Sequence, residues 1–137
     1  MSAEGNGRRR ILVVDDDSRA RAHAVDALSQ SGYQVDTAAS KAEVISLLAG
    51  RNYDLVLSDL KMPDLNGPAF YQVLKESCRG ATPRVIFWLR KGYTPEYANF
   101  LMRLAAPVLT KPVPAATLRQ AVERLLPAPR AASSVVS

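Results

Sequence analysis

Short apolar stretches alternate along this chain with longer segments in which apolar residues recur at helical spacing. Five of these stretches have the length and continuity of buried strands. They cover residues 10–14, 34–38, 54–58, 85–89 and 108–110. A segment with the pattern of a helix follows each stretch, so five strands and five helices should alternate. Such alternation is typical of a parallel sheet with right-handed crossovers and helices on both faces.

Capping residues indicate where the helices begin. Asp17 is expected to cap the first helix, because its side chain can accept from the free N–H groups of the first turn. Ser40, with Glu43 three positions later, matches a capping box for the second helix. The other three helices are predicted to begin near Gly67, Pro95 and Pro114.

The composition is that of one globular domain. Of the 137 residues, 47% are hydrophobic and 23% are charged, which is enough apolar material for a single core. We predict one domain over residues 10–126, a disordered basic tail over 1–9 and a flexible tail over 127–137 that is too short for an output domain. The chain has no apolar stretch of bilayer-spanning length and no signal-peptide pattern at its start. We therefore expect a cytoplasmic protein without a membrane partner.

The charge and the rare residues narrow the function further. Most of the net charge of +5 lies in the tails, and we interpret the arginines at 8–10 as solubilising, with no nucleic-acid partner for this chain. Cys78 is the single cysteine, so it fits a reducing compartment and is expected to be inert. His23 is the single histidine and is interpreted as an ordinary surface residue of the first helix.

Polar side chains follow three of the predicted strands at the points where those strands end. Asp15 and Asp16 follow the first strand, Asp59 follows the third, and Lys111 follows the fifth. Functional groups of an open parallel sheet gather at the carboxyl ends of its strands. These three ends should therefore place carboxylates and one ammonium in a single pocket, which could hold a divalent cation and accept a phosphoryl group.

Three sequence motifs in order show a family resemblance. They are VVDDD at 13–17, SDLKMPDLNG at 58–67 and TKP at 110–112. With them the chain, over about residues 10–126, resembles the response-regulator receiver domain of two-component signal transduction. The resemblance implies a flavodoxin-like, doubly wound, five-stranded parallel sheet of order 2-1-3-4-5 flanked by five helices. It also implies a signalling protein that is a monomer or a weak dimer, and not an enzyme.

The resemblance assigns roles to the pocket residues. Asp59 would be the phosphoacceptor, taking its phosphoryl group from a histidine kinase or a phosphotransfer protein. Asp15 and Asp16, with Asp59 and the backbone carbonyl of Lys61, would hold Mg²⁺, which prefers hard oxygen ligands. Lys111 would pair with a phosphoryl oxygen. By the same resemblance, the bond from Lys111 to the following proline is a candidate for the cis form.

The fourth and fifth strands depart from the receiver pattern. Receivers carry Thr or Ser at the end of strand four, followed by a small residue, and an aromatic residue in strand five. Here the hydroxyl position holds Leu89 or, in the other register, Trp88, and we favour Leu89. The small-residue position then holds Arg90, and the aromatic position holds Val108. Both the hydroxyl residue and the aromatic residue of the coupling that is usual in receivers are therefore absent.

Two hypotheses follow from this departure. In the first, Arg90 or Lys91 replaces the missing hydroxyl as a charge-assisted donor to the phosphoryl group. In the second, the domain is a phosphorylation-independent pseudo-receiver that acts as a protein interaction module. A third reading, a small phosphotransferase or phosphatase with an aspartate nucleophile, has only the spacing of Asp15 and Asp17 in its favour. Tyr93 and Tyr97 could form a docking surface or be partly buried.

Overall fold

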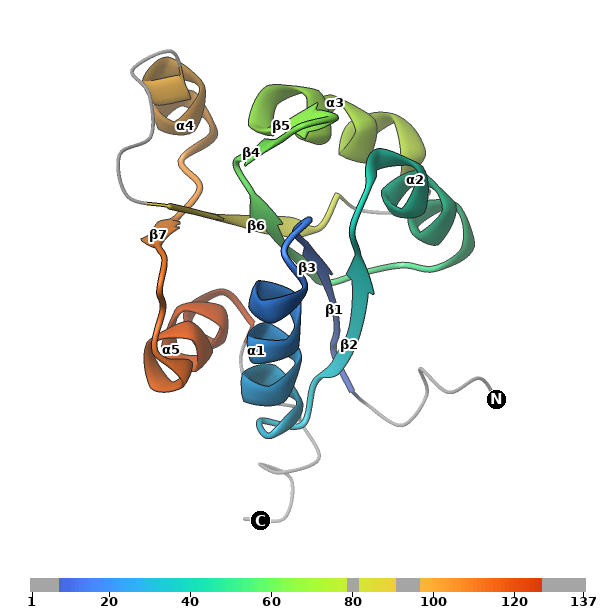
Figure 1. Ribbon diagram of the computed structural model, residues 1–137. Coiled ribbons are helices and arrows are strands. Elements are labelled where there is room, and N and C mark those ends of the chain that lie inside the picture. Colours follow the sequence, from blue (N-terminus) through green and yellow to red (C-terminus); the bar gives the residue numbers. More distant parts are fainter. Residues whose placement is uncertain (1–7, 79–81, 91–96, 127–137) are drawn as a thin grey trace.

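The computed structural model describes residues 8–78, 82–90 and 97–126, and it confirms the predicted alternation of strands and helices (Figure 1). The elements of the main sheet and its helices are, in chain order, β1 (Arg10–Val14), α1 (Ser18–Ser29), β2 (Gln34–Ala38), α2 (Lys41–Gly50), β3 (Leu55–Asp59), α3 (Gly67–Ser77), β6 (Arg84–Leu89), α4 (Ala98–Leu104), β7 (Val108–Thr110) and α5 (Ala115–Leu125). No helix within the described residues is both long enough and apolar enough to cross a membrane.

The five strands form one parallel sheet in the order β2-β1-β3-β6-β7. This is the predicted 2-1-3-4-5 topology, because β6 and β7 are the fourth and fifth strands of the sheet. The order reverses direction at β1, with β2 on one side of that strand and β3 on the other. The carboxyl ends of β1, β3 and β7 consequently lie along one edge of the sheet, where ligands bind in folds of this type.

Helices cover both faces of the sheet, as the doubly wound prediction requires (Figure 1). Helices α1 and α5 lie on one face, whereas α2, α3 and α4 lie on the other. The position of β1 between the two helical layers explains why its sequence is apolar throughout. Ile11 and Val13 pack in the core beneath α1 and α5, and the alternate residues Leu12 and Val14 pack in the opposite core. A strand between two helical layers needs apolar residues at every position.

Two of the predicted helix caps are present. The side chain of Asp17 accepts a hydrogen bond from the backbone N–H of Arg19 at 2.9 Å, before α1. Ser40 accepts from the N–H of Glu43 at 3.3 Å, before α2. The Glu43 carboxylate closes the box one residue earlier than the standard pattern, since it accepts from the N–H of Ala39. Pro95 lies outside the described residues, and α4 begins at Ala98.

A small hairpin after β3 was not predicted. Strands β4 (Lys61–Met62) and β5 (Leu65–Asn66) pair antiparallel and lead directly into α3. The same region shows that β3 runs to Asp59 rather than to residue 58. Asp59 is in register with Trp88, and the N–H of Leu60 donates to the Trp88 carbonyl at 3.1 Å. Two-residue strands carry no recognisable alternation, so tertiary hydrogen bonds decide this segment.

Candidate functional site

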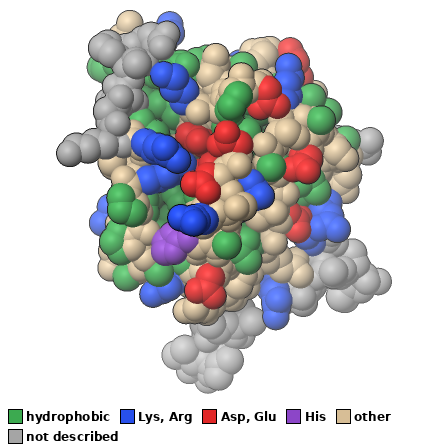
Figure 2. Space-filling model, in the orientation of Figure 1, with side chains coloured by type: hydrophobic (Ala, Val, Ile, Leu, Met, Phe, Trp, Pro, Cys, Tyr) green, Lys and Arg blue, Asp and Glu red, His purple; other side chains and the backbone are tan. Residues whose placement is uncertain are grey.

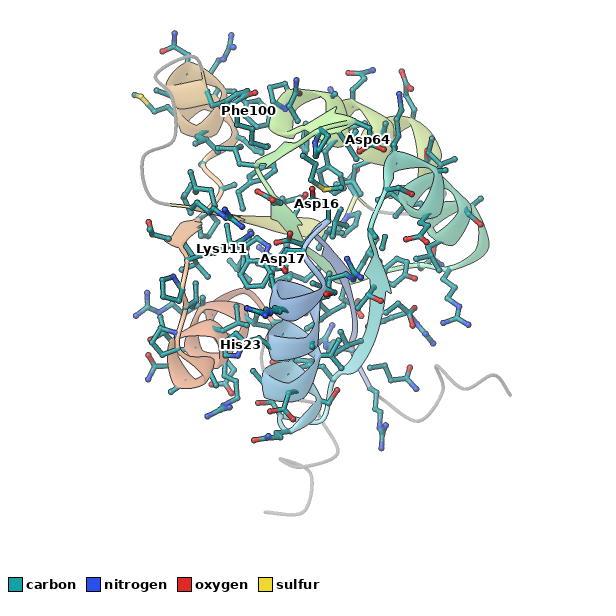
Figure 3. The ribbon with its side chains drawn as sticks, viewed as in Figure 1. Asp16, Asp17, His23, Asp64, Phe100 and Lys111 are labelled. Atoms are coloured by element: carbon teal, nitrogen blue, oxygen red, sulfur yellow. The ribbon has the colours of Figure 1, made fainter. Side chains whose placement is uncertain are left out.

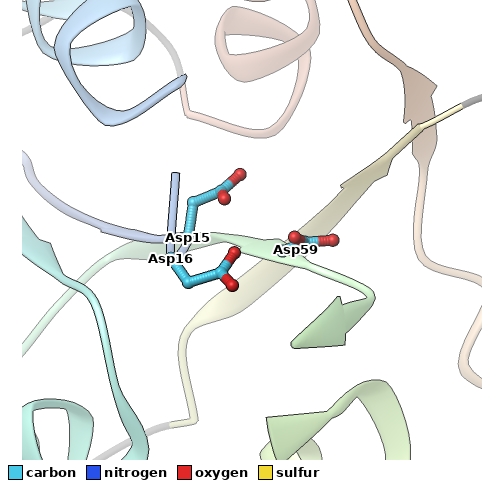
Figure 4. Close-up of side chains that lie close together, drawn as sticks. All are labelled: Asp15, Asp16 and Asp59. Carbon is cyan, nitrogen blue, oxygen red and sulfur yellow. The ribbon is translucent and has the colours of Figure 1, made fainter. Parts of the chain in front are cut away.

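The acidic side chains of the first and third strands meet at the carboxyl edge of the sheet. Asp15 and Asp16 directly follow β1, and Asp59 is the last residue of β3, the neighbouring strand. One carboxylate oxygen from each lies within 4.8 Å of the others. Figure 4 shows the three side chains extending into the same region from the two strand ends. Closely spaced carboxylate oxygens are the hard donors that a small divalent cation such as Mg²⁺ prefers.

A lysine from the fifth strand of the sheet reaches the same carboxylates. Lys111 follows β7, and its Nζ donates to Oδ2 of Asp15 at 2.5 Å while lying 3.6 Å from Oδ2 of Asp59. Asp15 is completely buried, and its other oxygen accepts from the N–H of Asp17 at 2.9 Å. The ammonium therefore compensates a buried negative charge that would otherwise be costly. The peptide bond from Lys111 to Pro112 is cis.

Burial and neighbouring charge weaken the acidity of Asp59. Asp59 as a whole residue is only 9% exposed, and loss of solvation is the main reason that its pKa is raised. Repulsion from Asp15 and Asp16 raises this pKa further. The pKa is lowered by the N–H of Lys61, which donates to Oδ1 at 3.2 Å, and by the ammonium of Lys111. The repulsion among these carboxylates would be relieved by a cation placed between them.

The site opens into a surface pocket of about 750 Å³. Figure 2 shows acidic side chains gathered on this face of the molecule, with basic side chains directly beside them. Figure 3 shows Asp16, Asp17 and Lys111 around the end of the sheet, between the helical layers. The lining residues are Asp15, Asp16, Asp17, Asp59, Leu60, Lys61, Met62, Pro63, Asn66, Leu89, Arg90, Tyr97 and Lys111. A volume of this size can hold a phosphoryl group together with a hydrated cation.

The residues that differ from the receiver pattern lie in different parts of the structure, and only some of them line the pocket. Leu89 lines the pocket and is 4% exposed, whereas Trp88 points into the core on the other face of the sheet. Arg90 lines the mouth of the pocket with an 84% exposed side chain, and its Nη2 lies 3.9 Å from Oδ2 of Asp17. Val108 is partly buried in the core beneath α2, α3 and α4, and it does not line the pocket. Lys91 and Tyr93 lie outside the described residues.

Sequence reasoning missed several features of the site. Tyr97 is partly buried, which was one of the two alternatives for it, but its sequence position gave no sign that it lines the pocket from the start of α4. Asn66 lines the pocket, and its side chain caps α3 by accepting from Ala69. The capping sequence before Gly67 could have identified the second role. His23 is exposed as predicted, although its Nε2–H donates to the carbonyl of Val113 at 2.6 Å.

Two groups other than the three converging carboxylates have altered acidity. Burial raises the pKa of the Cys78 thiol, which keeps it protonated and fits the prediction of an inert cysteine. The hydrogen bond from the N–H of Arg19 is the main cause that lowers the pKa of Asp17. Asp17 is therefore occupied by the helix terminus, which separates it from the three carboxylates that converge.

The described fold and site are matched by known proteins. The family model "Response regulator receiver domain" matches residues 11–123, and the chain belongs to this family. A receiver domain is a signalling module rather than a classical enzyme. The chain is 31% identical over 128 residues to the response regulator Rre1 of Synechocystis, which covers 93% of this chain and 55% of that protein.

Further relatives and solved structures agree with this membership. The sensor histidine kinase RcsC of Salmonella typhimurium is 31% identical over 119 residues, 87% of this chain but 12% of that protein. The chain thus spans only part of the curated relatives that it matches. The chemotaxis protein CheY4 of Vibrio cholerae has a TM-score of 0.74 and 26% identity, with 87% of this chain and 99% of that chain covered. A receiver domain protein from Clostridium thermocellum has a TM-score of 0.70 and 27% identity, covering 94% and 99% respectively.

Proposed function

We propose that this chain is a phosphoacceptor receiver that takes a phosphoryl group onto Asp59 with the help of Mg²⁺. The observation that carries the proposal is the convergence of the carboxylates of Asp15, Asp16 and Asp59 with the ammonium of Lys111 at one edge of the sheet. The donor would be a histidine kinase or a phosphotransfer protein. In support of this class of donor, CqsS of Vibrio cholerae, a matched relative, is named an autoinducer sensor kinase/phosphatase.

The chemistry requires an ionised carboxylate in line with the donor. An Asp59 oxygen attacks phosphorus, the new P–O bond forms as the P–N bond of the donor phosphohistidine breaks, and the electron pair of that bond returns to the imidazole nitrogen. Burial opposes ionisation of Asp59, because it raises the pKa of this side chain. Mg²⁺ held by Asp15, Asp16, Asp59 and the carbonyl of Lys61 would supply positive charge that favours the ionised carboxylate and the phosphoryl oxygens.

Lys111 supplies the second positive charge. Its ammonium is shared between Asp15 and Asp59 in the unmodified protein, at 2.5 and 3.6 Å. A phosphoryl group on Asp59 would bring further negative oxygens within reach of the same ammonium, which can donate three hydrogen bonds. Charge-assisted bonds of this kind are stronger than neutral ones. The lysine would thus hold the transferred group without leaving Asp15 entirely.

The experiment is to incubate the protein with acetyl phosphate and Mg²⁺ and measure its intact mass. We expect a single phosphoryl adduct in the unmodified protein and none in Asp59→Asn. Asp64→Asn is the matched control, because Asp64 lies nearby in the turn between β4 and β5 and accepts from the N–H of Lys41 outside the pocket lining. An adduct that persists in Asp59→Asn, or that disappears in Asp64→Asn alone, would contradict the assignment.

In a phosphorylated domain, another side chain would have to take the place of the usual hydroxyl donor. Arg90 is exposed, and within the described part of the chain its guanidinium makes a single ion pair, at 3.9 Å with Asp17, so it could turn toward a phosphoryl group. Under this hypothesis Arg90→Ala shortens the lifetime of the phosphorylated form, whereas Arg103→Ala, an exposed arginine on α4 outside the pocket lining, leaves it unchanged. Equal lifetimes for both variants would exclude a role for Arg90.

A second candidate function is a phosphorylation-independent interaction module. The observation that favours it is the apolar side chain of Leu89 at the pocket wall, together with the partly buried Val108 that lacks an aromatic ring. If this function is correct, beryllofluoride with Mg²⁺ perturbs backbone NMR signals only around the pocket carboxylates. Changes that spread to α4 and β7 would instead support a phosphorylation-dependent surface.

A further inference from the structure

Trp88 lies directly behind the lysine of the site. The Nζ atom of Lys111 is 5.0 Å from the centroid of the Trp88 ring, a distance at which the ring face attracts a cation. The indole is 1% exposed and belongs to the core beneath α1 and α5, outside the lining of the pocket. The ammonium therefore has carboxylates on the pocket side and an aromatic face on the core side.

The strand register accounts for this placement. Trp88 is in register with Asp59 on one neighbouring strand and with Leu109 on the other. Residues in register on parallel strands share a face of the sheet, and residues two apart on a strand do so as well. Lys111 follows Leu109 by two positions, so its side chain emerges on the same face, above the indole. A shift of one residue in either strand would separate the ring from the ammonium.

A tryptophan at this position carries a free-energy penalty. Its Nε1–H is buried and finds no hydrogen-bond partner among the described residues. A buried donor without an acceptor destabilises the folded state, and phenylalanine or leucine would avoid this penalty. The feature that a leucine could not provide is an electron-rich ring face close to the ammonium. The contact with the Lys111 ammonium is an interaction that can offset this penalty.

We propose that Trp88 is a positioning residue, whose ring holds the Lys111 ammonium between Asp15 and Asp59 in readiness for the incoming phosphoryl group. This inference rests on the proposed function, because it describes how the phosphoryl-pairing cation is placed. Without the ring, the ammonium would settle on Asp15, where it already lies at 2.5 Å, and would reach the phosphoryl oxygens less often. Transfer to Asp59 would then be slower.

The sequence allows a test at nearly constant side-chain volume. Trp88 is the single tryptophan of the chain, so biosynthetic incorporation of tryptophans with one, two or three ring fluorines alters only this site. Each fluorine withdraws electron density from the ring face and weakens its attraction for a cation. A merely structural tryptophan would give no graded response.

Two quantities are measured across the fluorine series. The first is the unfolding equilibrium constant of the metal-free protein, which we expect to rise about threefold over the series, and to stay constant when Lys111→Met removes the cation. The second is the initial rate of phosphorylation by acetyl phosphate with Mg²⁺, which we expect to fall by about the same factor. Lys75→Met is the matched control for the rate, because it removes a surface cation–ring contact, 5.3 Å from Tyr71.

The outcomes separate this inference from the function on which it rests. Unfolding constants that do not depend on fluorination show that the ring and the ammonium do not interact, and overturn the inference. A graded unfolding constant with an ungraded phosphorylation rate shows a contact that only stabilises the fold, and overturns the positioning role. If no variant is phosphorylated, the proposed function fails and the positioning role fails with it. In that case the unfolding series still shows whether the contact itself exists.

Discussion

Replacing Leu89 by threonine tests whether this position is where a hydroxyl would meet the phosphoryl group. Leu89 is the last residue of β6, lines the pocket and packs in the core beneath α2, α3 and α4. Threonine is β-branched and suits a strand. Its hydroxyl could donate to an oxygen on Asp59. The substitution thus restores the polar group that the family resemblance led us to expect, at a site that now holds an apolar side chain.

The effect on stability can be worked out from the burial of Leu89. Threonine has two fewer apolar carbons than leucine, and the lost transfer free energy is about 0.8 kcal/mol for each. Leu89 is only 4% exposed, so the smaller threonine leaves a cavity in the core, which adds a further penalty. We expect the free energy of unfolding to fall by about 2 to 3 kcal/mol in total. For a domain of this size the melting temperature should fall by roughly 8 to 12 °C.

The effect on function is measured against valine at the same position. Leu89→Val has the shape of Leu89→Thr without the hydroxyl, so the pair isolates one donor. A hydrogen bond to a charged group contributes about 1.5 to 3 kcal/mol. We therefore expect the threonine variant to bind beryllofluoride with Mg²⁺ at least tenfold more tightly than the valine variant, as measured by fluorescence of Trp88, whose ring adjoins Lys111. The valine variant should lose less stability than the threonine variant, because valine has one fewer apolar carbon than leucine and buries no hydroxyl.

Two results would refute this reasoning. Equal affinities of the threonine and valine variants would mean that a side chain at position 89 cannot reach the phosphoryl group. Leu89 would then not occupy the position at which receivers carry their hydroxyl. A melting temperature unchanged from that of the unmodified protein would mean that Leu89 does not fill the core as described.

Three further predictions concern other parts of the fold and site. Gly67→Ala should lower the free energy of unfolding by about 1 to 3 kcal/mol, measured by urea unfolding, because the added Cβ would lie 2.5 Å from Cδ1 of the buried Leu60. Gly50→Ala is the control, since the Cβ added there meets nothing within 4 Å. Asp59→Asn should raise the free energy of unfolding at pH 7 without Mg²⁺. Burial raises the pKa of Asp59, so its contribution to stability is lost as the pH rises through that pKa. The advantage of asparagine should therefore vanish below about pH 4, where the carboxyl is neutral in both states; an advantage that persists at pH 3 would contradict this cause. Tyr33→Phe should cost about 1 kcal/mol in thermal unfolding, because it removes the buried bond to the carbonyl of Leu126 at 2.8 Å, and an unchanged melting temperature would show that this bond contributes nothing.

Local patterns were sufficient for the five strands of the main sheet, for the helices that follow them and for the approximate place of the site, but not for the β4–β5 hairpin. Apolar stretches such as residues 10–14 predicted strands because both helical layers require apolar side chains there. Ser40 and Glu43 predicted the start of α2 because capping depends on residues within one turn. The positions of Asp15, Asp59 and Lys111 at strand ends predicted a shared pocket, since parallel strands place their carboxyl ends on one edge.

The contacts within the site were decided by tertiary structure. Nothing local to Trp88 indicates that its ring lies behind Lys111, because that contact depends on the register between β6 and β7. The position of Tyr97 in the pocket wall likewise depends on how α4 packs against the sheet. Local sequence therefore indicated which polar residues lie at or next to the strand ends and which chemistry they carry. The distances between those side chains follow from the packed fold, because each distance joins segments that are far apart in the chain and are brought together by packing of the core.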